Sequence, residues 1–204
     1  MSDRPRSRRP APRTSKPEPD PSGPALDIRI QSRRWREVED LKPRIGAAIT
    51  AAVALAPVKP APGAELNLLL TDDRRIRIVN RDWRGFDKAT NVLSFPAAPP
   101  ERIGTSPVIG DIVLAYETLV REAQAEDKAF GDHLSHLVVH GLLHLLGEDH
   151  DSDAQAQRME ALETAALARL GIADPYAHSE PEPEPSRPAS GTGNPKTRKP
   201  QPAS

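Results

Sequence analysis

The stretch VVHGLLHLLGEDHD, residues 138–151, contains three of the six histidines of this 204-residue chain. His140 and His144 are four residues apart, so in an α-helix their rings lie on the same face. Gly147 favours the end of that helix, because glycine readily adopts the left-handed conformation. The chain can then turn back and bring His150 to the same point. The spacing therefore predicts a three-histidine metal site at the end of a helix.

The ligand types indicate which metal this site binds. Three neutral imidazoles, with a fourth position left to water, are the ligand set of a catalytic zinc site. Imidazole-only ligation disfavours magnesium and calcium, which prefer oxygen ligands. A core helix with incidental polar residues is the alternative, but it gives no reason for the H-x-x-x-H-x-x-G-x-x-H spacing. We expect one zinc ion bound by His140, His144 and His150.

Two neighbouring side chains are candidates for orienting the ligand rings. His136 lies one helical turn before His140, and Asp149 directly precedes His150. A carboxylate that accepts a hydrogen bond from a ligand's second ring nitrogen fixes that ring and raises its basicity. Asp149 is equally compatible with a solvated loop acid. His133 fits a polar position at the edge of the helix.

The same spacing occurs in metzincin peptidases, which have a glutamate directly after the first histidine as general base. Here that position is Gly141. The motif therefore disfavours a zinc peptidase, although the helix is zincin-like in its metal geometry.

Around this helix, period-two and helical patterns alternate along the chain. The predicted strands are 25–32, 64–71, 90–96 and 107–116, and the predicted helices are 35–56, a short one after Asp72 and Asp73, 117–125, 132–146 and 152–171. In the short helix Ile76, Val79 and Trp83 share a face. This order predicts an α/β (α+β) fold, a mixed sheet of about four strands with surrounding helices.

Proline separates two tails from this domain. Residues 1–24 and 177–204 hold 14 of the 23 prolines and almost no large apolar residue, so we expect both to be disordered and the domain to span 25–176. The first tail is basic and could alternatively contact nucleic acid. The chain has no cysteine, which excludes thiolate ligands, and we find neither a signal peptide nor a membrane-spanning run. We expect a soluble cytoplasmic protein.

Charge limits how the domain could bind nucleic acid. Without the tails the chain keeps 18 basic and 23 acidic residues, so binding would need a local basic patch. Residues 74–88 provide one, with Arg74, Arg75, Arg77, Arg81, Arg84 and Lys88 against Asp82 and Asp87. About half of these fit a solvated helix face. Arg84, before a glycine, can reach into a cleft and bind a phosphate oxygen.

These segments together resemble the YbeY family of bacterial endoribonucleases. The stretch 136–150 is similar to the family's H-G-x-L-H-L-x-G-x-D-H signature, and VNRDWRGFDKATNVLSFP (79–96) is similar to its arginine-glycine and T-D-V-L-S-F-P region. GDIVLA (110–115) and MEALE (159–163) also match, so the resemblance covers about residues 26–172. Two positions differ from the family: Asn91 replaces an aspartate, and Glu148 replaces an aromatic residue and places extra negative charge beside the metal site, which is harmless if the side chain points outward.

The resemblance implies a single-strand-specific, metal-dependent endoribonuclease. It implies action in maturation of the small-subunit rRNA 3′ end and in ribosome quality control, with rRNA and the small ribosomal subunit as partners and neither DNA nor membrane. His140, His144 and His150 are then the zinc ligands, and Arg84 is catalytic. The alternatives are a ribosome-associated assembly factor with a structural metal and little catalysis, and the less favoured peptidase.

Overall fold

A four-stranded mixed sheet forms the centre of the computed structural model, which describes residues 23–177. Its strand order is β1-β2-β4-β3. The parallel strands are β1 (Ala25–Ile30), β2 (Glu65–Thr71) and β4 (Val108–Ala115), and β3 (Val92–Pro96) runs antiparallel to β4 at the edge. The predicted mixed sheet is confirmed. The two predicted tails lie outside the described residues except at their inner ends.

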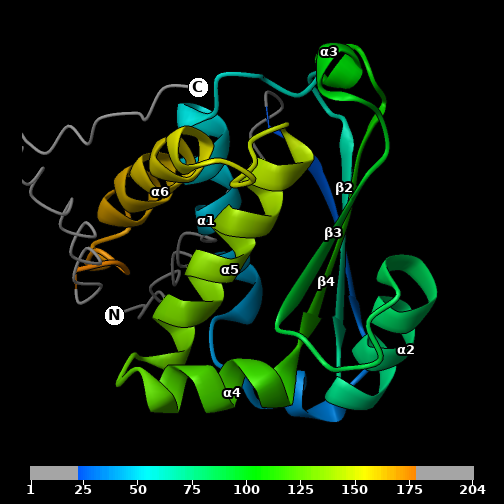
Figure 1. Cartoon of the computed structure of the whole chain (residues 1–204), viewed down its shortest axis with the longest axis vertical. Coiled ribbons are helices and arrows are strands. Elements are labelled where there is room, and N and C mark those ends of the chain that lie inside the picture. The colour runs from blue at the N-terminus through cyan, green and yellow to red at the C-terminus, as the bar shows by residue number, and fades with distance from the viewer. Residues whose placement is uncertain (1–22, 178–204) are drawn as a thin grey trace, which may run out of the picture.

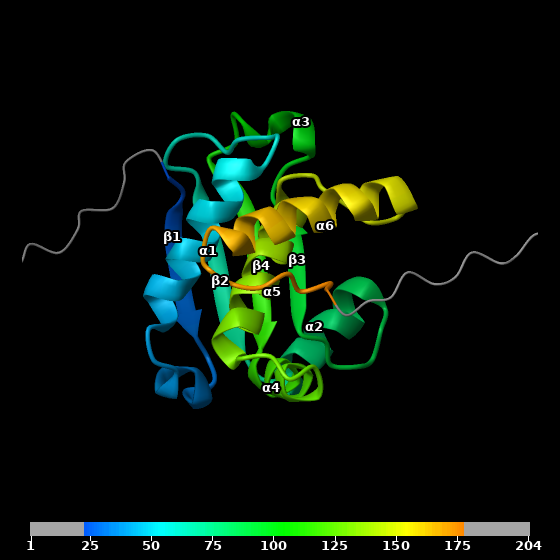
Figure 2. The same ribbon diagram turned by 90° about the vertical axis from the view of Figure 1, so that its left-hand side faces the viewer.

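Helices cover the two faces of the sheet unequally. On one side lie α1 (Leu41–Leu55), α5 (Phe130–Leu145) and α6 (Asp153–Ala168), and on the other lies α2 (Asp73–Arg84) (Figure 1). A further helix, α4 (Tyr116–Ala125), crosses one end of the sheet. Figure 2 looks onto the three-helix side, where α6 crosses in front of α5. The histidine helix α5 is therefore held between the sheet and α6.

The alternation of β2 explains the two packing layers. Leu66, Leu68 and Leu70 are at most 1% exposed and pack into the large core formed with α1 and α5. On the opposite face, Ile76 of α2 packs against Leu93 in a much smaller cluster. The edge strand β3 thus contacts α5 on one side and α2 on the other.

Two helical segments differ from the sequence prediction. The predicted helix 35–56 is divided into a 3₁₀-helix, η1 (Arg33–Glu37), and α1, because Asp40 has a φ of 50°, which an α-helix does not contain. A short helix, α3 (Pro100–Ile103), occupies a segment expected to be a loop. None of the helices in the described range is long and apolar enough to cross a membrane.

The N-terminal ends of α2 and α4 are joined by hydrogen bonds. Asp73 Oδ1 accepts hydrogen bonds from the backbone nitrogen and the hydroxyl of Thr118, while Glu117 accepts one from the Asp73 backbone nitrogen. Burial raises the pKa of Asp73, but the bonds from Thr118 and Arg121 outweigh it and hold the pKa below its ordinary value of 3.8. These contacts fix α2 and, with it, the position of Arg84 at its end.

Candidate metal centre and its cleft

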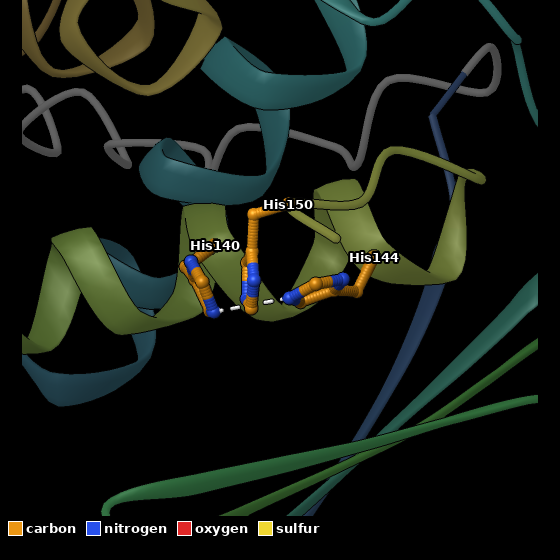
Figure 3. Close-up of side chains that lie close together, drawn as sticks. All are labelled: His140, His144 and His150. Atoms are coloured by element: carbon orange, nitrogen blue, oxygen red, sulfur yellow. Dashed lines mark hydrogen bonds between the residues drawn. The ribbon is translucent and has the colours of Figure 1, made fainter. Parts of the chain in front are cut away.

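The three predicted histidine ligands come together in the structure (Figure 3). The Nε2 atoms of His140 and His144 are 3.1 Å apart, and with His150 the three ligand atoms all lie within 4.8 Å of one another. Gly147 makes this possible: its φ is +93°, and a Cβ there would lie 2.7 Å from Pro100 Cβ. No side chain larger than hydrogen fits this turn, which returns the chain to α5.

Hydrogen bonds set the tautomers of the two helical histidines. His140 Nδ1 donates to Glu163 Oε1 at 2.8 Å, and His144 Nδ1 donates to the Glu148 carbonyl at 3.0 Å. Each ring therefore presents its Nε2 lone pair to the other. Burial, together with the nearby His140 and His150 rings, lowers the pKa of His144, which favours the neutral form that binds metals.

The distance between these lone pairs suits a metal ion. Two acceptors 3.1 Å apart repel each other unless a cation lies between them. Nitrogens bound at 2.0–2.1 Å to one tetrahedral zinc ion are about 3.3 Å apart by simple geometry. Among residues 23–177, His140, His144 and His150 form the group that could hold a metal. The arrangement fits a three-ligand site with one open position.

Glu163 of α6 is a site residue that the sequence analysis missed. It is 1% exposed, and its two carboxylate oxygens accept hydrogen bonds from His136 and His140, each at 2.8 Å. Burial raises its pKa, but these bonds outweigh that effect and lower the pKa to about 2. The available signal was a glutamate on the apolar face of α6, four residues from buried Met159 and from Leu167.

The predicted orienting residues have other roles. His136 bonds to Glu163 and so reaches His140 through that carboxylate. Asp149 Oδ1 lies 3.8 Å from His144 Nδ1, farther than the backbone carbonyl that takes this hydrogen bond, and it accepts from the His150 backbone nitrogen instead.

Two neighbouring side chains also show how the site is built. The Glu148 side chain is 8% exposed and its charge is paired with Arg158, while its backbone carbonyl accepts from His144. Asn91 keeps a hydrogen-bonding role without a charge, donating to Glu122 and accepting from the Val92 backbone nitrogen.

A cleft of about 610 Å³ contains the three histidines and Arg84. Arg84 is the last residue of α2, where Gly85 ends the helix with a φ of 78°. Its Nη2 donates to the carbonyl of Ser94 at 3.0 Å, and its guanidinium lies over the Phe95 ring. The structure therefore brings Arg84 and the histidines to the walls of one cavity, although they are far apart in sequence.

The other predicted RNA-binding residues do not line this cleft. Three of them are paired with carboxylates: Arg75 with Asp72, Arg77 with Asp87, and Arg81 with Asp82. Arg74 and Lys88 border a separate hollow that also contains Asp73 and Asp87. Of the six basic residues at 74–88, Arg84 is the one at the metal centre.

The position after the first histidine is tightly packed. Gly141 is buried against β3 and β4, and a Cβ there would lie 3.0 Å from Ser94 Oγ and 3.3 Å from Ile112 Cγ2. This side of α5 faces the sheet, so a larger side chain would require its neighbours to move. The packing disfavours the metzincin general base at this position.

Comparisons with known proteins agree with these observations. The family model described as endoribonuclease YbeY matches residues 29–171. Proteins named endoribonuclease YbeY from Methylocella silvestris and Rhizobium meliloti are 48% and 49% identical over 153 and 166 residues, covering 75% and 77% of this chain and 86% and 98% of theirs. A Thermotoga maritima solution structure aligns with a TM-score of 0.44 at 21% identity, covering 78% of this chain and 99% of that one.

Proposed function

The chain belongs to the YbeY family of endoribonucleases, and we propose that it is a zinc-dependent endoribonuclease that cleaves single-stranded RNA. The observation that carries the proposal is one cleft that contains both a three-histidine centre and an arginine held by a backbone carbonyl. Such a cleft can bind a metal and a phosphate group side by side. We propose residues 25–176 as the catalytic domain.

His140, His144 and His150 would hold the zinc ion, with Glu163 fixing the ring of His140. When bound, zinc supplies Lewis acidity at neutral pH. Three protein ligands leave one coordination position for solvent or substrate, whereas structural zinc sites close all four with protein ligands. This favours catalysis over the assembly factor with a structural metal.

Arg84 would stabilise negative charge on the scissile phosphate. One of its terminal nitrogens is bound to the Ser94 carbonyl, which fixes the guanidinium and leaves its other donors for the cleft. A fixed donor at a position where charge develops lowers the barrier more than a mobile one, because it needs no reorganisation. The planar guanidinium also suits two phosphate oxygens at once.

For the physiological substrate we propose small-subunit rRNA, as the resemblance to the family implies. The domain carries net negative charge and most of the basic residues of α2 are already paired. We therefore expect modest affinity for free RNA, because few unpaired cations are left to contact phosphates. Contacts with the ribosome would add the binding free energy that this domain lacks.

The test is cleavage of a 5′-labelled single-stranded RNA by the purified, zinc-loaded full chain, with metal content measured on every sample. We expect His144→Ala to lose both metal and cleavage. Arg84→Ala should keep its metal while cleavage falls about 10²- to 10³-fold, the usual cost of losing one fixed donor. Arg81→Ala is the matched control, because Arg81 is three residues away and paired with Asp82 outside the cleft.

Three results would contradict the proposal. Full metal content in His144→Ala would remove this histidine from the ligand set. Cleavage by Arg84→Ala at the rate of the parent would remove Arg84 from the mechanism. Zinc bound by a parent that leaves RNA uncut, both alone and on ribosomal particles, would favour the assembly factor.

A further inference from the structure

The chain has only seven aromatic residues of the Phe, Trp and Tyr types, and two of them are largely exposed. Trp35, Tyr116 and Phe130 contact one another around the core, with Trp35 fully buried. In contrast, Trp83 is 75% exposed and Phe86 is 60% exposed. Both flank Arg84, at the end of the helix that borders the cleft.

The exposure of Trp83 has a structural cause. Trp83 follows Ile76 by seven residues, or nearly two turns, so it points to the same side of α2. Ile76 packs against the sheet, whereas Trp83 in the last turn of α2 lies at the edge strand, with its ring 5.8 Å from the ring of Phe95 in an edge-on arrangement. The contact orients the Trp83 ring and leaves most of it in solvent.

Phe86 is placed by the end of the same helix. Gly85 has a left-handed conformation and turns the chain, and Phe86 then forms part of the cleft wall together with Arg84 and the histidines. Two exposed aromatic residues therefore precede and follow Arg84, the residue that we propose to bind the scissile phosphate.

We propose that Trp83 and Phe86 form a stacking platform for unpaired nucleobases next to the scissile phosphate. The proposal rests on the function proposed above and names the part of the substrate that this surface binds. Unpaired bases stack on exposed aromatic rings in many single-strand binding proteins, whereas bases in a duplex are already stacked on each other. The platform therefore gives a physical reason for single-strand preference.

The surroundings of the two rings favour RNA over a second protein surface. Arg81, Asp82, Asp87 and Lys88 lie beside the rings in sequence and are exposed, so the apolar surface is interrupted by charge. The centre of a protein–protein interface is depleted of charged residues, because burying them costs solvation. A nucleotide instead places its base on the ring and keeps its phosphate near solvent and cations.

Intrinsic fluorescence can test the platform directly, because Trp35 and Trp83 are the two tryptophans and Trp35 is 0% exposed. The full chain, treated with a chelator to prevent cleavage, is titrated with oligoadenylate, oligouridylate and a short RNA duplex. We expect saturable quenching by both single strands, with tighter binding of adenylate because purines have the larger stacking surface, and little quenching by the duplex. In Trp83→Phe the quenching should disappear.

Cleavage kinetics on the zinc-loaded protein provide the second test. Trp83→Ala and Phe86→Ala should each raise KM about 5- to 100-fold, equivalent to about 1–3 kcal/mol of lost stacking, with kcat nearly unchanged. Trp83→Phe should restore KM. The matched control is Ile78→Ala, since Ile78 is 44% exposed and lies on the opposite face of α2.

The outcomes separate this inference from the function on which it rests. Normal KM values in both alanine variants of a cleaving enzyme would overturn the platform and leave the endoribonuclease assignment intact. Quenching by single strands without any cleavage would support the platform and count against the catalytic proposal. A dimer in light scattering that Trp83→Ala converts to a monomer, without a change in RNA binding, would assign the surface to a second copy and overturn the inference.

Discussion

Replacing Glu163 with glutamine should weaken metal binding without unfolding the domain. Oε2 of this carboxylate accepts hydrogen bonds from His136 Nε2, at 2.8 Å, and from the Tyr176 hydroxyl, and Oε1 accepts one from His140 Nδ1 at 2.8 Å. A glutamine of the same shape has one acceptor and one donor group. Its amide nitrogen must face one of the two ring N–H groups, so one of these hydrogen bonds is lost.

The loss of zinc affinity depends on which of the two histidine rings changes its tautomer to accept from the glutamine amide. If the His140 ring exchanges tautomers to accept from the amide, its proton moves to Nε2, the atom that faces His144 at 3.1 Å, and that atom can no longer bind a metal. A hydrogen bond to a charged acceptor contributes about 1.5–3 kcal/mol. Loss of a carboxylate behind a metal-binding histidine usually lowers affinity about 10- to 100-fold, which is the same range of free energy.

The assay is competition for zinc between the full chain and a chromogenic chelator at pH 7, with thermal unfolding followed by circular dichroism. Glu160→Gln is the control, because Glu160 is exposed on the same helix and the substitution removes the same charge. We expect a 10- to 100-fold weaker zinc affinity for Glu163→Gln and no change for the control. Parental affinity in a folded Glu163→Gln would show that the negative charge of Glu163 does not contribute to zinc binding.

Three further substitutions test other parts of the structure. Gly147→Ala should lower the free energy of unfolding by about 1–3 kcal/mol, because φ is +93° and the added Cβ would meet Pro100 at 2.7 Å; equal denaturant midpoints would contradict this. Asp73→Asn should cost about 1 kcal/mol. Because the pKa of Asp73 is lowered in the folded state, that difference should be constant above about pH 5 and shrink as the pH falls through 3.8, which a pH series of unfolding curves would show. Arg77→Gln should leave the salt dependence of RNA binding unchanged, since Arg77 is bound to Asp87, whereas loss of a phosphate contact would reduce the slope by about one.

Local rules explain what could be predicted from the sequence. The spacing of His140, His144 and His150, with a glycine between the last two, depends only on helix geometry and on one turn, and the structure brings the three rings together. The strands were predictable for the same reason, because the alternation in β1 and β2 and the short apolar runs of β3 and β4 are patterns within single segments. The break at Asp40 lies in a charged stretch, and Pro43 was the available signal for it, because proline is tolerated in the first turn of a helix and not in its interior.

Contacts between distant elements explain what was missed. Glu163 is 23 residues from His140, and its role depends on how α6 crosses α5, which no local pattern specifies. The basic residues of α2 showed as a positive run in the sequence, but Asp87 folds back onto Arg77 and neutralises it. Trp83 shares a helix face with Ile76 as predicted, but its exposure depends on its position beside the edge strand β3, which no local pattern specifies.

Ser94 connects the two halves of the cleft and gives a reason for the glycine in the metal-binding motif. Its carbonyl accepts from Arg84, and its hydroxyl donates to the Gly141 carbonyl at 3.0 Å, so one residue of the edge strand holds both the arginine and the histidine helix. This requires α5 to approach β3 so closely that a Cβ at position 141 would lie 3.0 Å from the Ser94 hydroxyl. A glutamate there, as in the metzincins, would push α5 away from Ser94 and separate the histidines from Arg84. Close packing at Ser94 thus accounts both for the glycine that replaces the metzincin glutamate and for the attachment of Arg84 and α5 to the same strand residue.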